Sequence, residues 1–324
     1  MASCPQCSGD VERGAPHACT QVTVLTRAPS AAVDPFLGRV LGGQYRLLEK
    51  IGEGGFGAVY LAEHLHLKKH FAAKILRGDA ARADDAIRRF EIEAIAASKL
   101  DHDNIIDVVH FGRADDGVAY LVMEHLRGET LAQRLARGAL AFTDAVAVGA
   151  QLCRALQAAH GAGVVHRDLK PGNVFLAERG GRVTVKLLDF GVCRMIDDDR
   201  ADARMTRAGQ LLGTPLYMAP EALREDGELD ARADVYALGV ILYEMVTGAP
   251  PFVARDYLQV LRMHASTPPR PPSGARPDVP PQLERVILDA LEKDPAARHQ
   301  TAAHLEADLL AALPGAADSS LRLS

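Results

Sequence analysis

Residues 166–173 read HRDLKPGN, and residues 189–191 read DFG after a short apolar run. Asp168 can accept a hydroxyl proton, and Lys170 can steady a phosphoryl group in transfer. Asn173 and Asp189 offer the amide and carboxylate oxygens that Mg²⁺ prefers. Side chains of matched chemistry rarely coincide at such a spacing by chance, so this stretch predicts a site for phosphoryl transfer.

A glycine-rich segment lies upstream, where residues 52–57 read GEGGFG between two predicted strands. Gly52, Gly54 and Gly57 have no side chain, so backbone N–H groups there can approach a polyphosphate closely. A plain hairpin turn gives the same pattern and stays open as the alternative. A dinucleotide-binding turn is disfavoured, because a strand rather than a helix follows the glycines.

Two charged residues are expected beside this glycine segment. Lys74 ends the apolar run of a predicted strand, and Glu93 falls on the apolar face of a helix predicted over 83–100. An ammonium group at 74 can neutralise phosphate oxygens if a carboxylate fixes its position. Each residue taken alone is as consistent with a surface charge.

The apolar pattern divides the chain into a strand-rich first half and a mainly helical second half. A proline cluster between residues 268 and 281 predicts an irregular connection, because proline cannot occupy a helix interior. No internal repeat is present. Strands are predicted at 45–51, 58–62, 71–76, 118–123 and 183–188, and helices at 83–100, 148–159, 235–245 and 282–292.

With these segments in this order, the chain resembles the eukaryotic-type protein serine/threonine kinases that are widespread in bacteria, from about residue 42 to 310. The resemblance implies an α+β, bilobal protein-kinase fold with a small β-rich N-lobe, one key helix and a larger, mainly helical C-lobe. We expect a cysteine-containing appendage and linker over 1–40, a kinase domain over 41–310 and a tail over 311–324. The lobes would divide at residue 125.

The resemblance also implies the reaction and its residues. The γ-phosphoryl group of ATP would pass to Ser or Thr hydroxyls of protein substrates with Mg, or Mn, as the metal. Met123 resembles the gatekeeper, residues 124–126 the hinge that reads adenine, and Asn173 with Asp189 the metal ligands. The catalytic set would be Lys74, Glu93, Asp168, Lys170 and Asn173, and the nucleotide set Ile51, Gly52, Gly54, Gly57, Val59, Ala72, Lys74, Met123, Glu124, Leu126, Phe175 and Asp189.

Two supporting contacts are implied in the C-lobe. Glu221 of the segment Ala-Pro-Glu would pair with Arg298, and Asp234 would brace the catalytic loop. The sequence departs from the usual pattern at minor positions, such as Tyr236 where Trp is frequent, and none removes a catalytic group. A nucleotide-binding signalling scaffold without catalysis, a pseudokinase, remains the alternative.

Residues 192–212 contain one hydroxyl, that of Thr206. We hypothesise that phosphorylation of Thr206, in a transient homodimer, orders this segment by pairing with Arg167 and Arg194. A loop ordered by its own ion pairs is the alternative. Thr214, in Gly-Thr-Pro, resembles the serine/threonine branch of the family.

The amino-terminal residues carry a second motif. Cys4, Cys7, His17 and Cys19 are of a type that could hold one structural Zn, although the second pair has one intervening residue where two are usual. A tail with reduced thiols is the alternative.

Composition excludes several classes of protein. The formal net charge of −5 gives no general attraction to nucleic acid or anionic lipid. No apolar run is long enough for a membrane span, and five cysteines, three of them before residue 20, build no disulfide framework. We therefore expect a cytoplasmic protein that acts on proteins, without nucleic acid or a membrane span.

Overall fold

The computed structural model describes residues 2–3, 10–11, 34–54, 57–77, 84–189, 215–224 and 229–316. The chain divides into a unit of Met1–Leu37 and a unit of Gly38–Ser324. In the first unit, strands β1 (Ala2–Ser3) and β2 (Asp10–Val11) pair antiparallel. The second unit contains the other helices and strands of the described residues.

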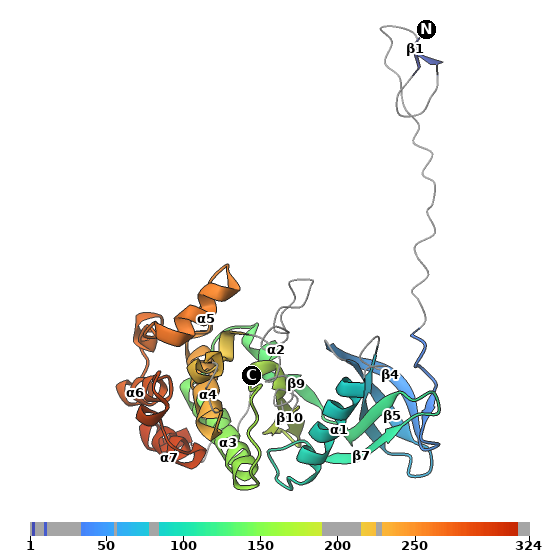
Figure 1. Ribbon diagram of the computed structural model, residues 1–324. Helices are drawn as coiled ribbons and strands as arrows, with labels where there is room; N and C mark the ends of the chain where they lie inside the picture. Colours follow the sequence, from blue (N-terminus) through green and yellow to red (C-terminus); the bar gives the residue numbers. More distant parts are fainter. Residues whose placement is uncertain are drawn as a thin grey trace. The chain divides into compact units, whose positions relative to one another are not determined.

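An antiparallel six-stranded sheet forms the N-lobe of the second unit (Figure 1), with strand order β3-β4-β5-β6-β8-β7. Alternating buried and partly exposed residues along β5 show why it forms a strand with one face toward the core. The strands are β3 (Val40–Leu41), β4 (Tyr45–Gly54), β5 (Gly57–His64), β6 (His70–Leu76), β7 (Val108–Arg113) and β8 (Ala119–Glu124).

Helix α1 (Asp84–Ser98) packs on this sheet through an apolar stripe. Ile87, Phe90 and Ala94 recur at three- and four-residue steps and are buried against Leu76 and Leu121. Full burial of a side chain the size of Ile87 or Phe90 contributes about 1.5–3 kcal/mol. Glu93 lies one residue before Ala94 on this helix, so the packing of the stripe fixes where its carboxylate points.

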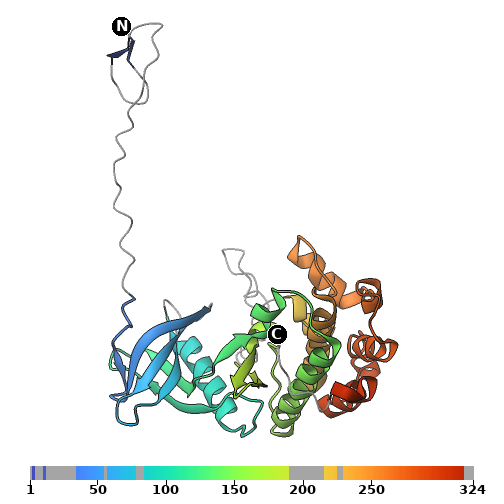
Figure 2. The ribbon, with the colours of Figure 1, turned by 180° about the vertical axis from the view of Figure 1, so that it is seen from behind.

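The C-lobe core is built around α4 (Ala231–Thr247), which is apolar on nearly all sides. Asp230 caps its first turn, and Gly248, at φ 86°, ends it in the left-handed conformation. Helices α3 (Phe142–Gly161) and α4 lie side by side (Figure 2). The remaining helices are α2 (Leu131–Leu135), α5 (Tyr257–Ser266), α6 (Pro281–Ala290) and α7 (Ala302–Ala312).

A small three-stranded sheet carries the segments on either side of the candidate site. Its strands β9 (Gly128–Thr130), β10 (Val174–Arg179) and β11 (Arg182–Leu187) lie in the order β11-β10-β9. Residues 166–173 lead into β10, and Asp189 follows β11 by two residues. A parallel bridge between Ile105 and Leu187 joins this sheet to the loop that follows α1.

Each helix and strand predicted from the apolar pattern is present, with shifted ends. The helix predicted to end at 292 ends at Ala290, because Leu291 turns back to bond the carbonyl of Leu288. Helix α7 ends at Ala312, and Ala316, just beyond it, is buried. Within the described ranges, no helix is both long and apolar enough to cross a bilayer.

Candidate active site

Lys74 of β6 lies between two carboxylates from different parts of the chain. Its Nζ is 2.8 Å from Oδ1 of Asp189 and 3.4 Å from Oε1 of Glu93. The predicted pairing of Lys74 with Glu93 is therefore confirmed. The ring of Phe90 lies beside the same ammonium group, 5.8 Å from its centroid.

Electrostatics keeps Lys74 and Asp189 charged. Burial alone would lower the pKa of Lys74, but the carboxylates of Asp189 and Glu93 outweigh it and raise that pKa above its usual value. The surrounding protein opposes ionisation of Asp189, yet the Lys74 ammonium holds the pKa of this carboxyl below its usual range. A cation beside an anionic carboxylate is thus in place at neutral pH.

The register of the sheet brings the predicted nucleotide-binding residues to one face. Lys74 lies opposite Val59 on β5, and Ala72 lies opposite Met123 on β8. Residues directly opposite in an antiparallel pair share a face, as do residues two apart on one strand. Val59, Ala72 and Met123 therefore line the face from which Lys74 projects.

The described glycines of this segment lie at the end of β4 and the start of β5, with Gly54 opposite Gly57. A Cβ on Gly57 would collide with the backbone oxygen of Ile75, so this glycine is required by the sheet itself. A Cβ on Gly52 would make an ordinary contact of 3.7 Å with Val59. Ile51 remains 46% exposed, which leaves an apolar side chain at the edge of the segment.

Side chains of the catalytic loop converge on Asp168. Lys170 Nζ is 2.7 Å from Oδ2 of Asp168, and the Asn173 amide donates to the carbonyl and to Oδ2 of Asp168 at 2.8 and 3.2 Å. Asn173 lies in a short 3-10 turn, residues Pro171–Asn173, and is buried. The residues that the motif predicted to act together are therefore held together in space.

Asp234 of α4 braces this loop, as predicted. Its carboxylate accepts hydrogen bonds from the backbone N–H groups of His166 and Arg167 at 2.8 and 2.9 Å. Arg167 has φ 63° and Asp189 has φ 36°, a region that non-glycine residues rarely adopt. The two contacts to Asp234 stabilise the unusual backbone at Arg167.

The chemistry of the donors fits a magnesium ion. Because the Asn173 amide nitrogen is engaged by Asp168, its amide oxygen is the atom that can ligate a cation. Asp189, two residues after β11, supplies a carboxylate that Lys74 keeps anionic. Oxygen ligands of this kind suit Mg²⁺, which usually keeps several waters and phosphate oxygens as further ligands.

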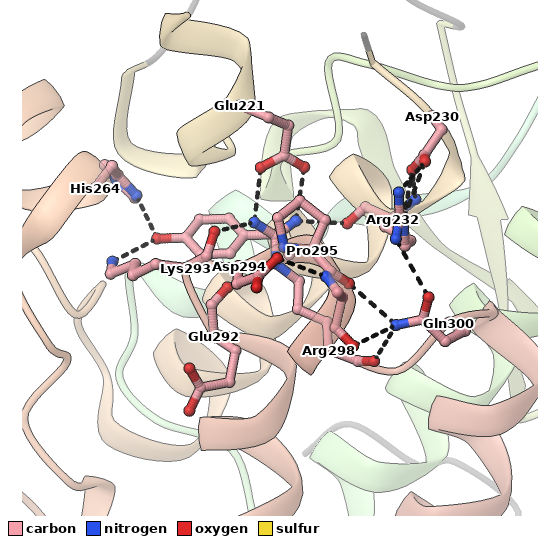
Figure 3. Close-up of polar contacts among 12 residues, drawn as sticks. Glu221, Asp230, Arg232, His264, Glu292, Lys293, Asp294, Pro295, Arg298 and Gln300 are labelled. Carbon is pink, nitrogen blue, oxygen red and sulfur yellow. Dashed lines mark hydrogen bonds and ion pairs between the residues drawn. The ribbon is translucent and has the colours of Figure 1, made fainter. Parts of the chain in front are cut away.

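The predicted pair of Glu221 and Arg298 is confirmed in the C-lobe (Figure 3). Two bonds of 2.6 Å join the guanidinium to both carboxylate oxygens, and the two residues are 3% and 7% exposed. The remaining guanidinium N–H groups bond the carbonyls of Arg232, Glu292 and Lys293. Every donor of Arg298 has an acceptor, as a buried charge requires.

Some predicted residues have other surroundings or lie outside the described ranges. Glu124 uses its backbone N–H to bond Asp107, and its side chain contacts Lys186, a residue that sequence reasoning did not single out. Leu126 and Phe175 are partly buried in the hinge and in β10. Thr206, Thr214 and Arg194, and the cysteine set Cys4, Cys7, His17 and Cys19, are not among the described residues.

His160 is a second residue that the motif reading missed. It comes from α3, and its Nε2 lies 2.8 Å from the Asp234 carboxylate that braces the catalytic loop. The two residues are 74 positions apart. No periodicity or spacing in the sequence points to this contact.

Comparison with known proteins places this geometry in a family. The family model described as "Protein kinase domain" matches residues 45–310. A serine/threonine-protein kinase, pkn3 of Myxococcus xanthus, is 42% identical over 282 residues, which is 86% of this chain and 51% of that protein. PknB of Mycolicibacterium smegmatis is 39% identical over 83% of this chain and 43% of its own length.

Solved structures of protein kinase domains share this fold. The crystal structure of the Mycobacterium tuberculosis PknI kinase domain is 29% identical, with a TM-score of 0.66 over 85% of this chain and 98% of that one. The chain belongs to the protein kinase domain family, and the predicted bilobal fold is confirmed. It spans about half or less of the length of the two named kinases.

Proposed function

We propose that this chain is a protein serine/threonine kinase that uses Mg-ATP. The observation that carries the proposal is that Lys74 contacts Asp189 and that Asn173 contacts Asp168; these residues come from β6, the segment after β11 and the catalytic loop. Intact groups at these positions argue against the alternative of a scaffold without catalysis. The names of relatives about 40% identical to this chain support serine and threonine as acceptors.

When bound, Mg-ATP supplies the γ-phosphoryl group and the cation that offsets its charge. Lys74 binds phosphate oxygens and is held in place by Glu93. Asn173 and Asp189 would hold the metal through their side-chain oxygens. Asp168 orients the acceptor hydroxyl and takes its proton, while Lys170, 2.7 Å away, offsets negative charge at the same point.

A test of this function compares the wild-type chain with Asp168→Asn. After incubation with Mg-ATP and a mixture of protein acceptors, phosphate is located by mass spectrometry. We expect phosphoserine and phosphothreonine with the wild-type chain and at least a hundredfold less with the variant. Tight ATP binding without any transfer by the wild-type chain would favour the scaffold instead.

We also propose that Thr206 is an autophosphorylation site within a transient homodimer. Arg167 supports this, because its backbone is fixed by Asp234 and its guanidinium is a natural partner for a phosphate. The variant Thr206→Ala should lose activity, and Thr206→Glu should recover part of it. Full activity of Thr206→Ala would refute the proposal.

A structural zinc ion is our proposal for the amino-terminal unit. Strands β1 and β2 pair antiparallel, and Cys4 and Cys7 fall between them in the sequence. The Cys-X-X-Cys spacing of Cys4 and Cys7 is typical of one zinc knuckle, with His17 and Cys19 as the other ligands. We expect about one zinc per chain, lost in Cys4→Ser/Cys7→Ser. Zinc retained by that variant would contradict the proposal.

A further inference from the structure

A cavity of about 250 Å³ lies beside α3. Its wall is formed by α3, β11, the loop after α1 and residues at the end of α7 and just beyond it. The described residues that line it include none of those assigned above to the nucleotide, the metal or the acceptor hydroxyl. Its volume is just below the roughly 300–1,000 Å³ of sites for drug-sized ligands, so it suits a smaller molecule.

Helix α3 presents one side to this cavity. Four of its residues, spaced three, four and seven positions from the first, line the wall, namely Ala147, Ala150, Gln151 and Arg154. This spacing places them on a single face of a helix. The two alanines are buried and give the wall an apolar part, whereas Gln151 and Arg154 bring polar groups to it. Ligand sites commonly combine surfaces of these two kinds.

Hydrogen bonds fix the orientation of two side-chain amides at the cavity. The Asn104 amide donates to the Val185 carbonyl at 2.9 Å and to Oε1 of Gln151 at 3.0 Å. Oε1 of Gln151 also accepts from the Val185 N–H at 2.9 Å. Because a backbone carbonyl only accepts and a backbone N–H only donates, these bonds establish which atom of each amide is nitrogen and which is oxygen.

Each amide keeps one group that can bind a ligand. Within the described ranges, no residue bonds Oδ1 of Asn104 or Nε2 of Gln151, although both side chains line the cavity. Asn104 is 6% exposed, and an acceptor left unpaired in such surroundings is costly. One acceptor and one donor on two bonded amides match a ligand group that has both a donor and an acceptor. A carboxamide is such a group.

Charged groups of both signs line the same cavity. Nε of Arg154 donates to Oε1 of Glu306 at 2.6 Å, while the Nη atoms of this guanidinium have no acceptor among the described residues. The Arg154 side chain is 50% exposed, and a guanidinium with free N–H groups binds carboxylates well. The Asp103 carboxylate has no donor in the described part of the chain and can accept from an ammonium group.

We propose that this cavity binds a free amino acid with a side-chain carboxamide, of the size of glutamine. The carboxamide accepts from Nε2 of Gln151 and donates to Oδ1 of Asn104. The carboxylate of the ligand pairs with Arg154, and its ammonium group pairs with Asp103. The inference goes beyond the proposed function and does not rest on it, because none of these residues takes part in phosphoryl transfer.

The test is isothermal titration calorimetry of L-glutamine into the full chain without nucleotide. We expect one site per chain with a Kd of about 1 mM or lower. L-Glutamate should bind at least tenfold more weakly, because its side chain cannot donate to Oδ1 of Asn104 and leaves that acceptor unpaired. Equal affinity for the two amino acids would overturn the inference. So would the absence of saturable glutamine binding up to about ten times that concentration.

Two variants locate the ligand. Gln151→Glu keeps an oxygen for Asn104 and for the Val185 N–H but loses the Nε2 donor, so it should weaken glutamine binding at least tenfold. Arg154→Leu removes the partner of the ligand carboxylate and should weaken binding by a similar factor. Arg137→Leu is the matched control, because Arg137 also forms an exposed pair of 2.6 Å, with Glu129, but does not line the cavity.

Arg137→Leu should bind glutamine as the wild-type chain does. Wild-type affinity in both Gln151→Glu and Arg154→Leu would overturn the inference, since the ligand would then bind elsewhere. If Gln151→Glu does not fold, the comparison of glutamine with glutamate on the wild-type chain decides the question. Phosphoryl transfer is measured separately, so its absence would refute the proposed function and leave this site unaffected.

Discussion

Two ion pairs that the sequence predicted have opposite surroundings. Glu221 and Arg298 form two short bonds in the C-lobe interior, and the guanidinium has an acceptor for every N–H group. Lys74 and Glu93 meet at 3.4 Å, and Lys74 is closer to Asp189 than to Glu93. The first pair is saturated, whereas the second shares its cation with another carboxylate.

The difference indicates what each pair does. A saturated buried pair cannot exchange partners without leaving a charge uncompensated, so it fixes the fold around η7 (Pro220–Leu223) and α4. A lysine shared by two carboxylates can turn toward a phosphate with little loss. We expect the Glu221–Arg298 pair to control stability and the Lys74 group to control turnover.

The largest expected effect is that of Arg298→Leu. It leaves the Glu221 carboxylate buried without its partner, which costs about 3–5 kcal/mol of unfolding free energy. Thermal unfolding should shift down by roughly 6–20 °C. Arg154→Leu, which breaks an exposed pair with Glu306, is the matched control and should cost less than about 1 kcal/mol. Equal losses of unfolding free energy in the two variants would show that the buried pair contributes no more to stability than the exposed one.

Next in size is the effect of Lys74→Met on catalysis. Loss of one preorganised charge at a transferring group lowers the rate about 10²- to 10³-fold. The rate of phosphoryl transfer should fall by this amount while the melting temperature changes far less than in Arg298→Leu. Lys68→Met, at an exposed lysine near the start of the same strand, should leave transfer intact.

An acid titration tests the protonation of His264, a buried residue near the Glu221–Arg298 pair. His264 is fully buried, and its Nδ1 lies 2.9 Å from the Tyr236 hydroxyl. The ring of Phe252 packs against its imidazole, and the ring of Tyr236 faces the Arg298 guanidinium. Burial first, and then the charge of Lys293, lower the pKa of His264 from 6.5 to about 4. The folded state therefore resists a proton that the unfolded state accepts.

The lowered pKa of His264 sets the direction in which stability changes with pH. Stability from His264 is complete above pH 6.5 and is lost as the pH falls from 6.5 to about 4, by at most on the order of 3 kcal/mol. Urea unfolding between pH 7 and 4 should show a shallower loss for His264→Asn than for the wild-type chain. Identical slopes would show that His264 is not held neutral.

The smallest predicted effect concerns a helix cap far from both pairs. The Thr301 side chain accepts from the N–H of His304 at the start of α7. Thr301→Ala should cost about 1 kcal/mol, and Thr301→Ser, which keeps the oxygen, a few tenths. Urea midpoints measure both, and a neutral Thr301→Ala would mean that the cap contributes nothing.

The sequence predicted most of what depends on local spacing. The roles of Asp168, Lys170 and Asn173 follow from positions within one loop, and the alternation in β5 follows from a period of two. The contacts of His160 with Asp234 and of Lys186 with Glu124 were not predictable. They join residues 74 and 62 positions apart, and nothing in either local pattern marks them as partners.

Measuring transfer and melting together in Glu93→Gln and Glu221→Gln separates an ion pair that serves catalysis from one that serves stability. Both changes remove one negative charge from an ion pair without changing side-chain size. For Glu93→Gln we expect at least a tenfold loss of turnover with a small shift in melting temperature. For Glu221→Gln we expect a larger shift in melting temperature with a smaller fractional loss of turnover. The reverse pattern would contradict the assignment of one pair to catalysis and the other to stability.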